Sequence, residues 1–189
     1  KHDAVEVAAS VLADLPALVA DLGYSWIELS PRDDFMPFFL HPRADRAQIA
    51  AFSRALNAAG VQVASVLPLY RWSGPDEDER QAAVRYWKRA IQITADLGVD
   101  TMNSEFNGRP EAAAASEAQF WRSMEELLPV FEREGVRLVL EPHPDDFIED
   151  GRAAVDLIRG IDKDWVSFLY CAPHTFHQGG DIEGIMKHA

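Results

Sequence analysis

Two short stretches of the sequence combine residue types that could bind a metal ion and move a proton. The stretch LVLEPHPDDF ends an apolar run on Glu141 and His143, and the stretch FLYCAPHTFHQGG ends one on His174 and His177. Adjacent strands lie about 4.8 Å apart, so a carboxylate and an imidazole leaving neighbouring strand ends can share one divalent cation. Mixed oxygen and nitrogen ligands suit Mn²⁺, Zn²⁺, Co²⁺ or Fe²⁺ better than Ca²⁺. We therefore predict a metal site at Glu141 and His174. The alternative is an ion pair that only caps the strand ends.

Two further histidines follow these ligands and are candidates for catalysis. His143 lies two residues beyond Glu141, on the same side of an extended chain, and prolines restrict the backbone on both sides of it. A rigidly held histidine beside a metal-bound substrate is well placed to move a proton. We predict that His143 is catalytic, with a loop histidine bonded to a carbonyl as the alternative. His177 is predicted to contact the substrate and assist catalysis, with a solvated loop histidine as the alternative.

Polar and aromatic side chains follow three other predicted strands and are candidates for binding a substrate. They are Arg32, Tyr70, Trp72, Glu105 and Asn107. Rings and a guanidinium of this kind can line a sugar pocket, although loop aromatics also pack between loops. The single cysteine, Cys171, is predicted to be a small core residue of its strand rather than a nucleophile.

The elements that must position these residues are five apolar β-rich runs separated by amphipathic helices. The runs are residues 24–30, 61–70, 100–108, 136–143 and 165–174. Apolar residues recur at helical spacing between the runs, as in Phe120, Met124, Leu127 and Phe131. Repeated βα units predict a parallel sheet with right-handed crossovers. A doubly wound sheet is disfavoured because no glycine-rich phosphate turn follows the first run.

A (β/α)₈ TIM barrel explains why the polar residues gather where the strands end. A full barrel needs about 250 residues, whereas this chain has 189 and shows about five βα units. We therefore expect residues 1–189 to be one partial TIM-barrel domain of the α/β class. Its first strand and its last two strands, with further metal ligands, are expected to be missing.

Composition excludes several other functional classes. The net charge of −13 argues against a nucleic-acid partner, because phosphates attract Lys and Arg. Apolar stretches are too short for a membrane helix, and the first residues have no signal-peptide core. One cysteine excludes an internal disulfide and fits a reducing compartment, so the expected location is the cytoplasm.

The predicted strands end in NSEFNG, LVLEPH and APHTFHQGGD, and these strand ends resemble those of the xylose-isomerase-like barrels of sugar isomerases and epimerases. The resemblance implies one divalent metal, Mn²⁺ in the first place and otherwise Co²⁺, Zn²⁺, Mg²⁺ or Fe²⁺. It implies that Glu141 binds the metal and serves as an acid or base. The next strand of the family ends in Asp-x-x-His, where the Asp binds metal and the His contacts substrate. His177 matches that histidine, and His174 stands where the aspartate is expected.

At His174 and His143 the sequence differs from the usual epimerase pattern. In these two positions it resembles the barrel subunits that deglycosylate 3-oxo-glycosides, including C-glycosides, by β-elimination. Those barrels work with a small second subunit. The leading hypothesis is a metal-dependent sugar isomerase or epimerase that polarises a sugar carbonyl and abstracts the proton on the adjacent carbon. A β-eliminating lyase and a non-catalytic barrel that binds a sugar or a protein are the alternatives. The expected partners are a small carbohydrate and either further copies of the chain or a small second subunit.

Overall fold

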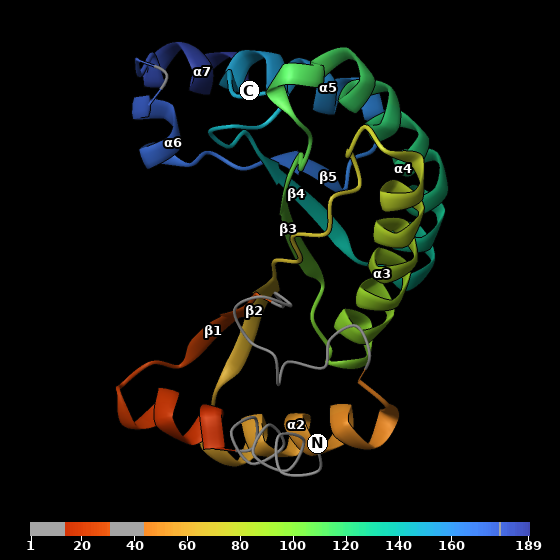
Figure 1. The fold of residues 1–189 in the computed structure, drawn as a ribbon. Helices are drawn as coiled ribbons and strands as arrows, with labels where there is room; N and C mark the ends of the chain where they lie inside the picture. Colours follow the sequence, from red (N-terminus) through yellow and green to blue (C-terminus); the bar gives the residue numbers. More distant parts are fainter. Residues whose placement is uncertain (1–13, 31–43, 178) are drawn as a thin grey trace.

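The centre of the computed structural model is a parallel sheet of five strands, each paired with the next along the chain (Figure 1). The structure describes residues 14–30, 44–177 and 179–189, so Arg32 lies outside the described residues. The strands are β1 Trp26–Leu29, β2 Gln62–Val66, β3 Thr101–Glu105, β4 Arg137–Glu141 and β5 Val166–Phe168. The helices are α2 Arg46–Ala59, α3 Glu77–Asp96, α4 Ala113–Glu134, α5 Gly151–Ile161, α6 Ala172–His177 and α7 Ile182–His188, with a short 3₁₀ turn η1 Pro110–Ala112 before α4. A further helix at 14–21 precedes β1. The predicted alternation of strands and helices is confirmed.

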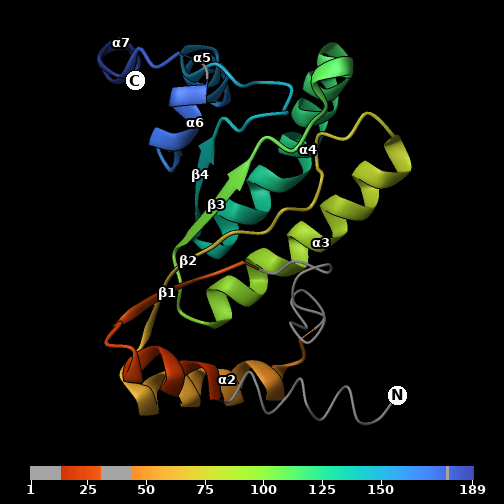
Figure 2. The ribbon, with the colours of Figure 1, turned by 60° about the vertical axis from the view of Figure 1, so that its left-hand side comes forward.

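Helices α3 and α4 lie side by side over one face of the sheet (Figures 1 and 2). Their ends follow from local sequence signals. The Asp76 side chain accepts a hydrogen bond from the backbone N–H of Glu79 and caps the start of α3, as Asp150 caps α5. Gly135 ends α4 with a φ of 67°, a left-handed conformation that glycine adopts without steric cost. These caps return the chain promptly to the next strand.

An aromatic cluster fills the space between the helices and the sheet. The rings of Trp72 and Trp87 stack with centroids 4.2 Å apart, and Phe120 meets the edge of Trp72. Trp72 is completely buried, and its indole N–H donates to the carbonyl oxygen of Phe106 at 2.8 Å. Of the two alternatives for Trp72, lining a sugar pocket or packing, the structure supports packing, because the ring belongs to the core.

Side chains alternate between the two faces of β3 and β4. Leu138 and Leu140 are fully buried in the core beneath the helices. Glu105 and Glu141 lie on the other face, and their Cα atoms are register partners at the ends of their strands. The two carboxylates therefore leave adjacent strands at the same level and on the same side.

The last predicted strand is shorter than expected. The sequence predicts it over 165–174, but β5 ends at Phe168 and α6 begins at Ala172. Pro173 is accommodated because a proline is tolerated in the first turn of a helix, where its missing N–H would have no intrahelical partner. His174 therefore stands in the first turn of α6 rather than at the end of a strand. In the part of the chain that the structure describes, no helix has both the length and the apolar character needed to cross a membrane.

Candidate metal and proton-transfer site

The candidate site lies at the carboxyl ends of β3, β4 and β5. Because the strands are parallel, these ends meet at one edge of the sheet, and β4 points toward α6 (Figure 2). The structure brings four of the predicted residues together there: Glu105, Glu141, His143 and His174. The clustering of polar residues at strand ends, inferred from the sequence, corresponds to a real cluster in space.

Glu141 and His174 form the pair predicted to bind metal. The Oε2 atom of Glu141 lies 3.7 Å from the Nδ1 atom of His174, and their side chains are only 12% and 24% exposed. The Nδ1 atom is buried and has no hydrogen-bond partner among the described residues. Buried polar atoms are nearly always satisfied, so an orphaned imidazole nitrogen facing a carboxylate indicates a position for a ligand such as a metal ion.

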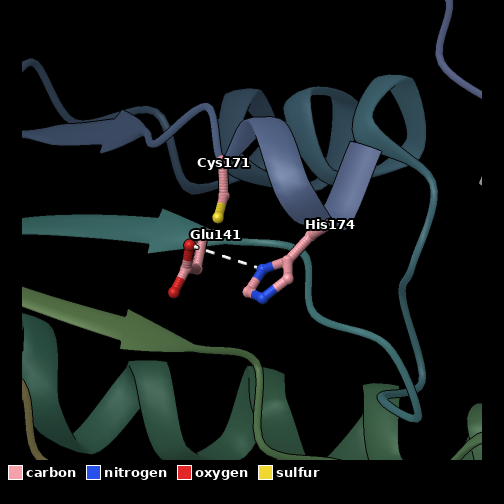
Figure 3. A group of neighbouring side chains, drawn as sticks. All are labelled: Glu141, Cys171 and His174. Carbon is pink, nitrogen blue, oxygen red and sulfur yellow. Dashed lines mark ion pairs between the residues drawn. The ribbon is translucent and has the colours of Figure 1, made fainter. Parts of the chain in front are cut away.

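Cys171 is a third member of this group that the sequence analysis did not place there. One ligand atom from each of Glu141, Cys171 and His174 lies within 4.8 Å of the others, and Figure 3 shows the sulfur and the imidazole both directed toward the carboxylate. Burial raises the pKa of the Cys171 thiol, and the Glu141 carboxylate raises it further. The spacing Cys-x-x-His at the start of a helix was the signal that could have revealed this neighbour, because residues three apart share one helix face.

His143 is held beside this group from the loop after β4. Its Nδ1 atom lies 2.7 Å from the carbonyl oxygen of Pro144, and because a carbonyl only accepts, Nδ1 carries the hydrogen. Its Nε2 atom is then free to act as a base and lies 3.6 Å from Oε1 of Glu105. The His143 and His174 rings meet edge to face with centroids 4.3 Å apart. A proton-accepting nitrogen therefore stands next to the candidate metal ligands.

The buried Asp146 carboxylate joins the loop that follows β3 to the loop after β4 that carries His143. Asp146 accepts hydrogen bonds from the backbone N–H groups of Asn107 and Gly108, both at 2.6 Å. Burial raises the pKa of Asp146, although these backbone donors oppose the shift. A Cβ on Gly108 would lie 2.3 Å from the Phe147 ring and 2.8 Å from a side-chain carbon of α4, so only glycine fits this approach. The close contact fixes the loop after β3 against the loop after β4.

Two other predicted substrate-binding residues, Asn107 and Tyr70, contact parts of the protein other than the Glu141–His174 group. Asn107 is 9% exposed, has a φ of 58°, and its amide donates to Ser104 Oγ and to the Glu105 carbonyl oxygen. The Tyr70 ring packs against Tyr86 and Trp87 of α3.

His177 lies on α6, so its backbone follows the turn that carries His174. Arg32 precedes α2 in the chain, outside the described residues.

Comparison with known proteins agrees with this architecture. The model of the Xylose isomerase-like TIM barrel family matches residues 16–188, so the chain belongs to that family. The resemblance inferred from the sequence is confirmed, and the five βα units are part of a TIM barrel. No functionally curated protein matches the chain by sequence.

Three solved structures resemble the chain at low sequence identity. A D-psicose 3-epimerase determined in the presence of D-fructose superposes with a TM-score of 0.77 at 14% identity, over 94% of this chain. A D-psicose 3-epimerase with D-tagatose, from Clostridium cellulolyticum H10, gives 0.76 at 19% over 93%. The IOLI protein with a bound zinc atom gives 0.73 at 18% over 95% of this chain and 66% of its own. The chain spans 63% of the length of each epimerase. At these identities the likeness establishes the shared fold.

Proposed function

We propose that the protein is a metal-dependent sugar isomerase or epimerase that abstracts the proton next to a sugar carbonyl. One observation carries this proposal: the buried, unpartnered Nδ1 atom of His174 faces the Glu141 carboxylate at 3.7 Å. The epimerases that share the fold were crystallised with D-fructose and D-tagatose, and the IOLI protein holds zinc. These relatives support a carbohydrate substrate and a divalent metal.

Glu141 and His174 are the residues that would hold the metal. Their oxygen and nitrogen donors fit a divalent ion such as Mn²⁺, Co²⁺, Zn²⁺, Mg²⁺ or Fe²⁺. When bound, such an ion supplies a Lewis acid that polarises a carbonyl oxygen. Both side chains are mostly buried, which limits the access of bulk water to the pair. Glu141 lies at the end of β4, a rigid strand, so its carboxylate is held in place before a substrate arrives.

His143 is the proposed base. The Pro144 carbonyl oxygen keeps the hydrogen on Nδ1, which leaves the Nε2 lone pair to take a proton from the substrate carbon. The Glu105 carboxylate, 3.6 Å from Nε2, faces the proton that the ring would then carry. Return of a proton to the opposite face of the same carbon would give epimerisation, and return to the neighbouring carbon would give isomerisation. Glu141 is the proposed second acid or base in that step.

The substrate contacts are proposed from residues around this group. Glu105 at the end of β3 and His177 on α6 are the first candidates, and Tyr70 and Arg32 are candidates from the loops after β2 and β1. Asn107 donates its amide within its own turn, which supports a role in positioning Glu105 rather than in direct contact with the sugar.

The test follows a carbon-bound proton. We expect the protein, incubated with D-fructose or D-tagatose in D₂O, to exchange one sugar proton for deuterium, as seen by NMR. A chelator should stop the exchange, and adding back a divalent metal (Mn²⁺, Co²⁺ or Zn²⁺) should restore it. The variant His174→Ala should lose bound metal in elemental analysis and lose the exchange. A wild-type protein that binds no divalent metal and exchanges no sugar proton contradicts the proposal.

The alternative reaction shares the first step. If the group beyond the deprotonated carbon leaves, a 3-oxo-glycoside loses its aglycone by β-elimination. The observation that favours this reaction is the additional imidazole of His143 beside His174. Release of an aglycone from a 3-oxo-glycoside, without deuterium exchange into ketohexoses, would select the lyase.

A further inference from the structure

The thiol of Cys171 lies inside the candidate metal site. One ligand atom each from Cys171, Glu141 and His174 lies within 4.8 Å of the other two (Figure 3). We infer that Cys171 is a third protein ligand and that the site takes a thiophilic ion, Zn²⁺ or Co²⁺, in preference to Mn²⁺. This inference rests on the proposed function, because it concerns the metal of that same site.

The three donors come from positions that the fold fixes. Glu141 is the last residue of β4, Cys171 immediately precedes α6, and His174 stands in the first turn of that helix. Cys171 and His174 are three residues apart at the start of α6, and Figure 3 shows both side chains directed toward Glu141. Each of the three residues is partly buried. The thiol donates to Glu141 rather than pointing into the apolar core, contrary to its predicted role as a core residue.

The spacing of the donors fits a single ion. Zn²⁺ binds sulfur at about 2.3 Å and nitrogen or oxygen at about 2.0–2.2 Å, so donors on one tetrahedral ion lie roughly 3–4 Å apart. The 3.7 Å between His174 Nδ1 and Glu141 Oε2 falls in that range, and the sulfur lies within 4.8 Å of both donors. Modest side-chain rotation would therefore close the group on an ion.

The ligand set decides which ion is preferred. Cysteine sulfur, histidine nitrogen and carboxylate oxygen are all ligand types found in zinc sites. Thiolate is a soft ligand that selects Zn²⁺ over the harder Mn²⁺ and Mg²⁺, which prefer carboxylate and water oxygens. On binding, the sulfur–hydrogen bond breaks, a metal–sulfur bond forms, and the thiol proton leaves with solvent. The oxidation states of sulfur and metal do not change.

The experiment uses Co²⁺ as a spectroscopic probe on the whole protein. Cys171 is the single cysteine of the 189-residue sequence, so a thiolate-to-Co²⁺ charge-transfer band in the near ultraviolet that is lost when Cys171 is replaced is assigned to it. We expect this band together with visible d–d bands in the wild type. In Cys171→Ser the charge-transfer band should vanish, the d–d bands should persist, and the affinity for Zn²⁺ should fall by more than about 100-fold, since loss of an outer partner alone costs 10–100-fold.

Two controls separate this result from misfolding. Glu28→Gln removes a carboxylate on β1 that is already hydrogen-bonded within the sheet, and it should keep the charge-transfer band. In the unmodified wild type, Zn²⁺ should protect the thiol from a thiol-specific reagent, a measurement that depends on no variant.

The possible outcomes decide whether the thiolate is a metal ligand. Co²⁺ bound with d–d bands but no charge-transfer band, with thiol reactivity unaffected by Zn²⁺, would overturn the role of Cys171 and leave the Glu141–His174 site intact. Failure to bind Co²⁺ or Zn²⁺ at all would overturn both the thiolate ligand and the proposed metal-dependent function.

Discussion

Two glutamates on the same face of the sheet have opposite kinds of partner. Glu28 on β1 accepts hydrogen bonds from Ser65 on β2 and Asn103 on β3, both at 2.5 Å, so two donors from the sheet bind its carboxylate. Glu141 on β4 faces an imidazole nitrogen without a hydrogen-bond partner among the described residues and a thiol. The difference teaches what makes a carboxylate on a strand a candidate metal ligand. Its neighbours are other residues that can bind a metal, such as His and Cys, whereas a carboxylate surrounded by hydrogen-bond donors serves the structure.

The largest expected effect separates these two glutamates. Glu141→Gln should weaken metal binding by more than about 100-fold, because it removes a direct ligand, and turnover should fall to background. Glu28→Gln should keep the metal content of the wild type, since Gln still accepts from Ser65. Elemental analysis after dialysis and a turnover assay measure both. Equal metal loss in the two variants would break the comparison.

A second prediction separates metal binding from proton transfer within the site. His143→Ala should retain bound metal but reduce turnover by about 10²–10⁴-fold, the usual contribution of a positioned acid or base. The control is His188→Ala, because His188 pairs with Asp156 between α7 and α5, and its loss should leave turnover unchanged. Activity retained in His143→Ala would exclude the role of this residue as the base.

A third prediction concerns the carboxylate that joins the loops. Asp146→Ala leaves the buried N–H groups of Asn107 and Gly108 without an acceptor and should lower the free energy of unfolding by about 3 kcal/mol. The neighbouring Asp145 is exposed, and Asp145→Asn should change stability by only about 0.5 kcal/mol, because Asn tolerates its φ of 65°. Denaturant titration measures both. Equal stabilities would show that the loops are held by other contacts.

The smallest effect is expected at a third kind of carboxylate, one paired with arginine. Glu77 on α3 binds the guanidinium of buried Arg80 at 2.8 Å, and these hydrogen bonds lower the pKa of Glu77 from 4.5 to about 2. Because the folded-state pKa lies below the unfolded value, the stabilisation is fully present above pH 4.5 and is lost as the pH falls toward about 2. The melting temperature of the wild type should exceed that of Glu77→Gln at pH 7 and converge with it near pH 2. A constant difference across this range would assign the effect to packing.

The sequence was sufficient for the parallel architecture and for the clustering of Glu105, Glu141 and His143 at one edge of the sheet. Five apolar runs and the helical stripes between them specify which segments pair and pack, and parallel pairing then requires that Glu105, Glu141 and His143 end at one edge. The strand order could also be predicted, because each strand pairs with the strand that follows it in the chain.

Other features depend on contacts that local patterns do not encode. Cys171 follows an apolar run and therefore looked like a core residue, but β5 stops at Phe168 and the chain turns the thiol toward Glu141. Trp72 looked like a loop aromatic, and only the stacking on Trp87 from α3 shows that it is core. In both cases the environment of the side chain depends on a contact with a residue far away in the sequence, which local patterns do not show.

The sequential order of the strands also bears on how the protein is made. Each strand can pair with a segment already synthesised, so β1 to β4 and the helices over them can assemble as the chain emerges from the ribosome. Cys171 and His174 are translated after all of these elements. In a nascent chain, β1 to β4 would therefore be in place before Cys171 and His174, two residues of the proposed metal site, leave the ribosome.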